Sequence, residues 1–215
     1  MADLDLASQT ASELAAVLAD PRQPTPGAIE RNARRMRDGA RSALERLVTL
    51  MARQTPVAGD LRLTMALLQV TNKEGLIANQ FDLITAELLE IDPDAPPETA
   101  IGVLLERMAR AAADQLARSA AALLNRDVAA AVEVGYADLQ INALNRRVFD
   151  LVRARDGSAR LRGTGLHLML VARSVERLGD NAVDVAEQAA FVATGSYQEF
   201  SDASRPHQAR GNFTA

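Results

Sequence analysis

Apolar residues recur at three- and four-residue steps along most of this chain, in long stretches that end at proline-containing segments. This spacing places the apolar side chains on one side of an α-helix, so each stretch predicts a long amphipathic helix. Aromatic residues make up only 3% of the chain and tryptophan is absent, whereas β-sheets favour aromatic and β-branched side chains. The sequence therefore predicts an all-α fold.

The expected helices fall into two sets of three. They cover residues 3–19, 28–53 and 60–89, and then residues 98–124, 127–155 and 164–194. The segment from Asp92 to Pro97 contains the dense proline cluster of the chain interior, where a connection between two similar halves is expected. Long helices joined by short turns pack most simply as antiparallel bundles. We therefore predict two tandem three-helix bundles, over residues 1–92 and 98–195, followed by a disordered tail over residues 196–215.

Charge and composition exclude several classes of protein. The formal net charge of −4 gives no general attraction to nucleic acid or to an anionic membrane. The absence of cysteine removes disulfides and thiolate metal sites. No basic start typical of a signal peptide is present, and no apolar run approaches the length that spans a bilayer. We expect a cytoplasmic protein that neither binds nucleic acid nor inserts into a membrane.

The last expected helix carries four carboxylates on one narrow side. At about 100° per residue, an arc of roughly 80° contains Glu176, Asp180, Asp184 and Glu187. Like charges four residues apart cost roughly 0.2–0.5 kcal/mol per pair on an isolated helix, so a positive charge must compensate them. The apolar residues of this helix fill its opposite side, which predicts that the carboxylates are accessible to solvent.

Two motifs resemble the PhoU family of phosphate-signalling proteins. The first is Arg-x-x-Glu-Arg-Leu-Gly-Asp-x-x-x-Asp-Val-Ala-Glu over residues 173–187, inside the longer similar segment 166–195. The second is Gln-Thr-Pro-Val-Ala-Gly-Asp-Leu-Arg over residues 54–62, where we expect Asp60 to cap the third helix. The resemblance extends over residues 1–195 and implies the same tandem three-helix layout.

The resemblance also implies a metal site in the second half. In the family, an acidic residue followed four positions later by Asp occurs on neighbouring helices and binds metal ions. The side chains that match or extend this motif are Asp138, Asn142, Glu176, Asp180, Asp184 and Glu187. Oxygen ligands suit Fe, Mn or Mg, and carboxylates also bind Zn. Because Arg173 and Arg177 each precede a carboxylate by three residues, we expect them to orient the ligands.

The first half departs from the metal motif. The positions that correspond to the acidic stripe are Gly75, Asn79, Leu83 and Ala86, and those of the partner helix are Asn32 and Met36. None of these residues is acidic, so we expect no metal cluster there. We expect His167 to pack or lie at the surface, because it falls about 180° away from Glu176 on the same helix.

The implied function is regulatory and not catalytic. The resemblance implies an adaptor that holds a phosphate-sensing histidine kinase in its non-activating state when phosphate is plentiful, and that contacts the ATP-binding subunit of a phosphate transporter. These partners would bring the protein to the inner face of the membrane. The sequence does not decide between a monomer and a homodimer. Three alternatives remain: a solvated acidic face with weak ion pairs, a structural or metal-buffering bundle, and a di-metal oxidase. The oxidase is disfavoured because such sites use Glu-x-x-His pairs and no histidine lies on the stripe.

Overall fold

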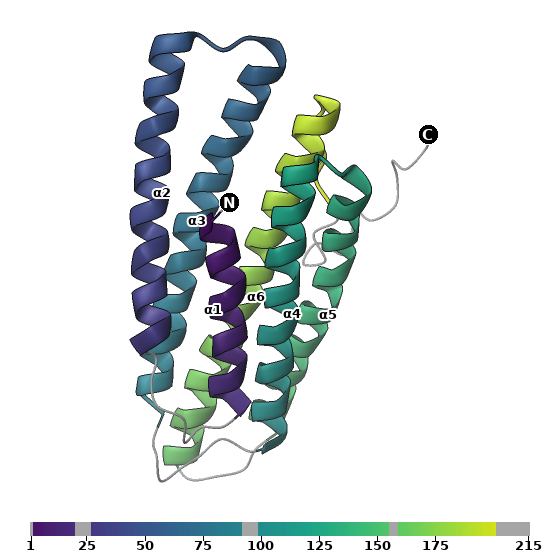
Figure 1. The fold of residues 1–215 in the computed structure, drawn as a ribbon. Coiled ribbons are helices and arrows are strands. Elements are labelled where there is room, and N and C mark those ends of the chain that lie inside the picture. The colour runs from purple at the N-terminus through teal and green to yellow at the C-terminus, as the bar shows by residue number, and fades with distance from the viewer. Residues whose placement is uncertain (1, 20–26, 92–98, 155–158, 201–215) are drawn as a thin grey trace.

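The computed structural model describes residues 2–19, 27–91, 99–154 and 159–200. All regular secondary structure in these ranges is helical, which confirms the all-α prediction (Figure 1). The helices are α1 (Ala2–Ala19), α2 (Gly27–Gln54), α3 (Ala58–Leu89), α4 (Thr99–Asn125), α5 (Val128–Arg153) and α6 (Ala159–Thr194). The expected linker at 92–97, the loop at 156–158 and residues 201–215 of the expected tail lie outside the described ranges.

The helices lie side by side along one direction and form an elongated molecule (Figure 1). In the second half, α4, α5 and α6 all pack against one another, whereas in the first half the main pair is α2 and α3. The first helix, α1, packs more extensively against α4 than against α2 or α3, and α3 packs extensively against α6. The two sets of three helices are therefore joined along two long helix pairs.

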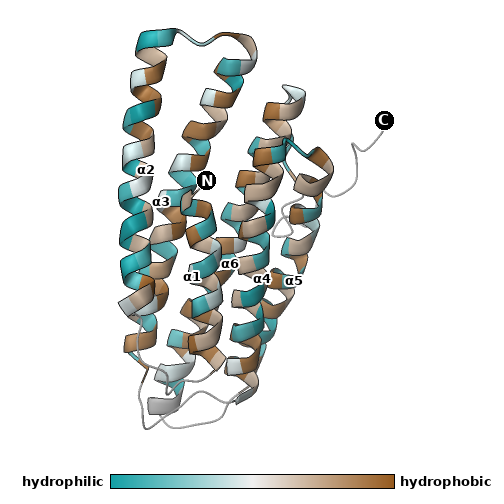
Figure 2. Cartoon of the chain, viewed as in Figure 1, coloured by the Kyte–Doolittle hydropathy of each residue, from teal (hydrophilic) through white to brown (hydrophobic). Residues whose placement is uncertain are grey.

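One cluster of buried apolar side chains draws on all six helices. Phe81 and Ile77 of α3 and Met108 of α4 are among its fully buried members, and alanines fill much of the remaining space. Small side chains let the helix axes approach closely, which explains how a chain with few aromatic residues fills its interior. Hydrophobic and hydrophilic residues alternate along every helix (Figure 2).

Within the described residues, no third helix covers the outer turns of α2 and α3. With 18 residues, α1 begins partway along the α2–α3 pair, which extends beyond it at the end where residues 55–57 join the two helices (Figure 1). The apolar periodicity of residues 28–53 predicts that Leu44 and Leu50 lie on one buried stripe, but they are 46% and 36% exposed. On α3, Leu61 and Met65 are likewise 40% and 43% exposed. The prediction of burial is wrong for these turns of α2. Apolar periodicity identifies the apolar side of a helix, but it does not show how far a neighbouring helix covers that side.

Two helix starts differ from the sequence prediction. The third helix begins at Ala58 after Val57, whose side chain makes no capping hydrogen bond, so Asp60 lies in the first turn and is not the cap. The last helix begins at Ala159 and runs through Gly163 and Gly165. A Cβ at position 165 would lie 2.8 Å from Cγ1 of Val152, so the glycine permits close packing of α6 on α5.

No helix in the described ranges combines the length and the apolar character needed to cross a membrane.

Candidate functional site

Helix α6 carries most of the acidic residues that the sequence predicts as metal ligands. Because α6 packs against α3, α4 and α5, neighbouring helices cover much of its circumference. Glu176 and Glu187 are only 6% and 5% exposed, Asp184 is half-buried and Asp180 is exposed. The prediction of a solvent-accessible carboxylate stripe is therefore wrong for Glu176 and Glu187, since a helix with three neighbours has little free surface.

Glu176 is paired within its own helix. Arg173, one turn earlier, donates from Nη1 to Oε2 of Glu176, which confirms the contact that the spacing predicts. The guanidinium is half-exposed, whereas the carboxylate is almost fully buried. The arginine therefore neutralises the buried charge of Glu176 from the solvent side. Arg177 is exposed.

Asp138 of α5 lies in a small polar group between α4, α5 and α6. Asn142 donates from Nδ2 to Oδ2 of Asp138 at 2.5 Å, and Gln115 of α4 donates from Nε2 to Oδ1 at 3.5 Å and to the carbonyl of Val134 at 3.1 Å. A Cβ at Gly179 of α6 would lie 2.8 Å from both Asp138 Oδ1 and Gln115 Oε1. The glycine therefore lets α6 approach these two oxygens.

Gln115 is a site residue that the sequence analysis missed. Its side chain is almost fully buried, and its Oε1 has no hydrogen-bond partner among the described residues. Nothing in the α4 sequence marks this position, because a single glutamine among alanines and leucines is an ordinary helical residue. Only the packing of α4 against α5 brings it to Asp138.

Asp184 is paired with the first half of the chain. Lys73 of α3 donates from Nζ to Oδ2 of Asp184 at 2.5 Å, and both side chains are partly buried. This ammonium is one of the positive charges that the acidic stripe requires. Its source could not be predicted from the sequence, because it depends on the packing of α3 against α6.

Glu187 is held by the segment that follows α6. The hydroxyl of Tyr197 donates to Oε2 at 2.9 Å, and the backbone N–H of Phe200 donates to Oε1 at 2.8 Å. Burial raises the pKa of the Glu187 carboxyl, while these two hydrogen bonds lower it in part. Burial and the bond to Glu187 also raise the pKa of Tyr197. Residues 196–200, which the sequence assigns to the tail, are therefore fixed against α6.

The predicted ligands thus have separate surroundings. Among the described residues, no group of three His, Cys, Asp or Glu side chains is placed so that it could hold a metal ion. The structure places Asp138, which is bonded to Asn142, beside Gly179, the residue that precedes Asp180 on α6. It engages Glu176, Asp184 and Glu187 with other partners. Whether a metal binds at this helix stays a prediction.

The other positions named from the sequence have ordinary roles. In the first half, Asn32 donates to Oε2 of Glu13 at 3.2 Å, Met36 is fully buried and Leu83 is exposed. Nδ1 of His167 lies 2.7 Å from Oε2 of Glu87. This partly buried contact joins α6 to α3. These contacts hold helices together.

Comparison with known proteins identifies the second half of the chain most directly. Residues 105–189 match the family model described as the PhoU domain. The chain is 28% identical over 161 residues to a protein of Zymomonas mobilis named "Phosphate-specific transport system accessory protein PhoU homolog", covering 70% of this chain and 62% of that relative. A protein of the same name from Caulobacter vibrioides is 29% identical, covering 74% of this chain and 69% of the relative. The chain thus matches less than two thirds of the length of the Zymomonas relative.

Solved structures show the same fold over nearly the whole chain. The phosphate transport system regulatory protein PhoU from Streptococcus pneumoniae superposes with a TM-score of 0.78 at 18% identity, covering 92% of each chain. PhoU from Pseudomonas aeruginosa superposes with a TM-score of 0.72 at 20% identity, covering 91% of this chain and 93% of that one. At these identities the likeness concerns the fold.

Proposed function

Because this chain belongs to the PhoU family, we propose that it is a non-catalytic regulator of phosphate uptake and of phosphate-starvation signalling. The observation that carries the proposal is the PhoU domain over residues 105–189, shared with relatives that are named as accessory proteins of phosphate-specific transport. The surface of long helices supports a role in binding other proteins.

Two partners follow from the family resemblance. One is a phosphate-sensing histidine kinase, which the protein would hold in its non-activating state when phosphate is plentiful. The other is the ATP-binding subunit of the phosphate transporter. Binding of both would let one adaptor couple the transport of phosphate to the transcriptional response.

A pull-down from purified components tests the adaptor role. The full chain is immobilised and offered the cytoplasmic part of the sensor kinase and the transporter ATPase of the same organism, at high and at low phosphate. We expect specific retention of at least one of them. Retention of neither protein under either condition would contradict the proposal and favour a structural bundle.

We also propose a metal site, with fewer ligands than the sequence implies. Its oxygen donors would be Asp138, Asn142, Glu176 and Asp180. Of these, Asp138 lies at Gly179 beside the buried Gln115 Oε1, which lacks a hydrogen-bond partner within the described residues. Because no three acidic side chains converge among the described residues, Glu176 and Asp180 would have to turn toward Asp138 to bind the ion. Such oxygen donors suit Mg, Mn or Fe, and also Zn. Asp184 and Glu187 are engaged by Lys73, Tyr197 and Phe200 and are left out of this site. Glu176 would have to exchange its bond to Arg173 for the ion. When bound, the ion would supply positive charge to the acidic residues.

Elemental analysis of the purified protein tests the metal site. Asp180→Ala removes an exposed carboxylate of the proposed set, and Asp150→Ala removes an exposed carboxylate elsewhere on α5 as the control. We expect the wild type and the control to carry the same metal and Asp180→Ala to carry less. Equal content in all three proteins would remove the metal proposal while leaving the adaptor proposal intact.

A further inference from the structure

The chain reverses its direction where α6 ends. Gly195 has a φ of +81°, a conformation that favours glycine, and its N–H donates to the carbonyl of Phe191 at 2.8 Å. The guanidinium of Arg62 on α3 lies close to this glycine, because a Cβ at position 195 would be 3.2 Å from Nη1 of Arg62. After this turn, residues 196–200, which we call the strap, run back along α6 as far as Glu187.

The strap lies across the boundary between α5 and α6. The buried carboxylate of Glu187 on α6 accepts hydrogen bonds from the hydroxyl of Tyr197 and from the N–H of Phe200, at 2.9 and 2.8 Å. On α5, the side chain of Phe200 lies against Gly135, which has no Cβ to obstruct it, and is only 6% exposed. The surface around Gly135 and Glu187, which we call the strap site, therefore holds a peptide segment by an aromatic side chain and a main-chain N–H.

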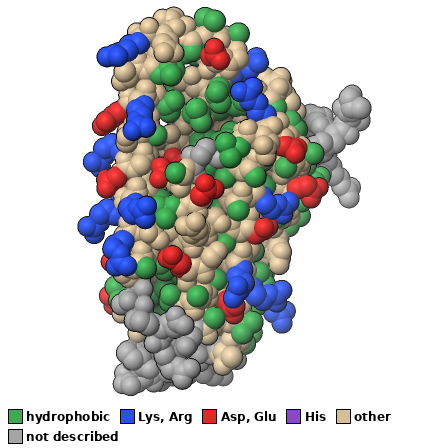
Figure 3. All heavy atoms as spheres, in the orientation of Figure 1, with side chains coloured by type: hydrophobic (Ala, Val, Ile, Leu, Met, Phe, Trp, Pro, Cys, Tyr) green, Lys and Arg blue, Asp and Glu red, His purple; other side chains and the backbone are tan. Residues whose placement is uncertain are grey.

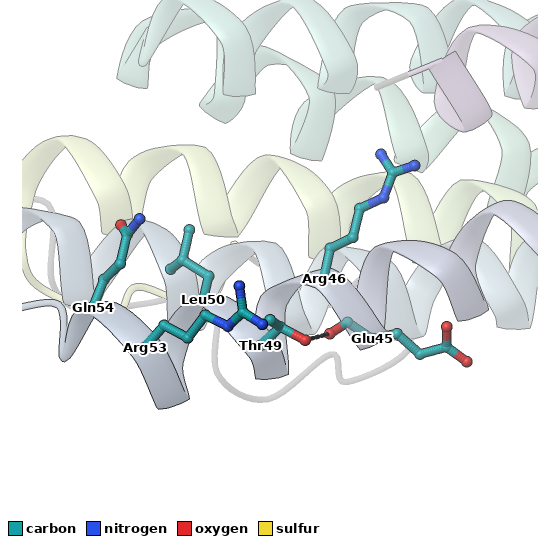
Figure 4. Close-up of a pocket in the computed structure, with 6 residues that line it drawn as sticks. All are labelled: Glu45, Arg46, Thr49, Leu50, Arg53 and Gln54. Carbon is teal, nitrogen blue, oxygen red and sulfur yellow. Dashed lines mark hydrogen bonds between the residues drawn. The ribbon is translucent and has the colours of Figure 1, made fainter.

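Other parts of the surface are built less specifically. A hollow of about 470 Å³ on α2 is lined by residues of that helix alone, which include both Arg46 and Glu45 (Figure 4). Basic, acidic and hydrophobic side chains are interspersed over the face drawn in Figure 3. The strap site differs from these regions because two helices form it and a peptide segment is already seated in it.

The Glu187 carboxylate makes the strap site depend on an occupant. A buried carboxylate is costly unless it accepts hydrogen bonds, and the two donors that engage this one both belong to the strap. A strap that moved away would therefore leave a place for another segment that brings an N–H and an aromatic side chain. A site with these requirements recognises a short nonhelical peptide.

The charge of the strap does not match its site. Glu199 directly precedes Phe200, whose N–H lies 2.8 Å from the Glu187 carboxylate, so two negative side chains come close together here. Burial is the main cause of the raised pKa of Glu187, and the smaller effects include repulsion from Asp184 and from Glu199. A segment with Lys or Arg in the position of Glu199 would replace this repulsion with attraction.

We propose that the strap site is a docking site for a short segment of a partner protein, and that the strap is its built-in competitor. The segment would read Tyr-x-Lys/Arg-Phe, with its phenylalanine over Gly135 and the N–H of that residue on Glu187. Because the strap is tethered directly to α6, it competes at an effective concentration of about millimolar, and a partner displaces it through the better match of charge. This inference goes beyond the proposed function and requires neither the metal site nor a phosphate-dependent partner.

Binding of two labelled peptides tests the proposal. Their sequences are Gly-Ser-Tyr-Gln-Arg-Phe-Gly and Gly-Ser-Tyr-Gln-Glu-Phe-Gly, so that they differ only at the position of Glu199. In the full chain, Phe200→Ala removes the anchor of the strap and should tighten binding of the arginine peptide by roughly tenfold or more, as measured by fluorescence anisotropy. This variant should also prefer the arginine peptide over the glutamate peptide by about fivefold. Tyr197→Phe loosens the strap more gently and should produce a smaller gain in the same direction.

A matched pair of carboxylate variants locates the source of the preference. In the Phe200→Ala background, Glu187→Gln keeps an acceptor for the peptide N–H but removes the charge, so the preference for the arginine peptide should fall to within about twofold. Glu133 is exposed and lies about 160° away from Gly135 around α5. Glu133→Gln removes the same charge there and should leave the preference unchanged. An equal fall in both variants would show general charge attraction and overturn the proposal.

A reporter on the strap detects its displacement. Because the chain has no cysteine, a fluorophore can be attached to Gln198→Cys, or to Val103→Cys near the start of α4 as the control. We expect an excess of the arginine peptide to change the emission at position 198 only. The proposal fails if neither peptide binds the Phe200→Ala chain, if both peptides bind it equally, or if Phe200→Ala converts a dimer into a monomer, which would show that two copies exchange their straps.

Discussion

At the scale of single residues, the carboxylates of α6 are compensated one by one. Glu176 meets Arg173 of its own helix, Asp184 meets Lys73 of α3, and Glu187 meets donors from residues 197 and 200. A shared metal ion is one way to hold neighbouring carboxylates together, but separate protein donors relieve the same repulsion. An acidic stripe in a sequence therefore shows that compensation is needed without showing its source.

Glu74 should make stability depend on pH. Burial is the largest influence on this carboxyl and raises its pKa above the usual value of 4.5. Because the folded state then holds its proton more tightly than the unfolded state, this group's contribution to stability is complete below about pH 4.5 and is lost as pH rises through the folded pKa. In the wild type, the unfolding free energy should therefore fall as the pH rises from about 4.5 through the folded pKa of Glu74. We expect Glu74→Gln to make this fall smaller, as measured by urea denaturation at several pH values.

The exposed residue Glu90 supplies the control for this titration. Glu90→Gln removes the same charge and should leave the pH dependence of unfolding close to that of the wild type. If both variants change the dependence equally, net charge is the cause and the burial of Glu74 is not.

Gly135 on α5 should be intolerant of a side chain. A Cβ there would lie 2.9 Å from Cβ of Phe200, which is almost fully buried against the helix. We expect Gly135→Ala to lower the unfolding free energy by about 1–3 kcal/mol or to displace residues 197–200. Gly163→Ala on α6, where no atom outside the helix backbone lies within 4 Å, should stabilise by roughly 0.5–1 kcal/mol through helix propensity. Denaturant titration of both variants measures the difference, and equal effects would contradict the assigned contact.

At the scale of helices, the two candidate caps should differ in energy. Asp127 precedes α5, and its Oδ1 accepts a hydrogen bond from the N–H of Ala130 at 3.0 Å. We expect Asp127→Ala to cost about 1 kcal/mol of unfolding free energy. Asp60→Ala, which removes a first-turn charge from α3 without removing a cap, should cost roughly 0.3 kcal/mol. A larger loss at Asp60, measured by thermal denaturation, would restore the capping role that the sequence suggests.

The helices themselves were largely predictable. Every expected helix is present, and five of the six starts agree with the structure to within about two residues, because proline and apolar periodicity act locally. For α6 the sequence predicts a start at Thr164, five residues after the observed start at Ala159, because Gly163 and Gly165 are typical of a helix boundary. In the structure, the second of these glycines serves the packing of α6 against Val152.

The candidate site was predictable only in part. The acidic residues of α6 and the pairing of Arg173 with Glu176 follow from spacing along one helix. Lys73 and Gln115 reach the same region from α3 and α4, far away in the sequence, so no local pattern could identify them. The burial of Glu176 and Glu187 was missed for the same reason, since it depends on three neighbouring helices.

At the scale of the whole molecule, the packing joins the two predicted bundles into one body. The extensive packing of α1 on α4 and of α3 on α6 links the halves, and Lys73 and His167 form polar contacts across the same boundary. The apolar cluster contains side chains from all six helices. A repeat in sequence and a unit of folding are therefore different things here: the repeat has three helices, but the core has six.

Unfolding should consequently occur in a single step. Because tryptophan is absent, Leu83→Trp on α3 and Tyr136→Trp on α5, both at exposed positions, report separately on the two halves. We expect their fluorescence transitions in guanidinium chloride to coincide with each other and with the loss of helical circular dichroism, since neither half can lose its contacts without exposing part of the shared core. Two separated midpoints would instead show that each set of three helices is an independent domain, and that the contacts of α1 with α4 and of α3 with α6 add little to stability.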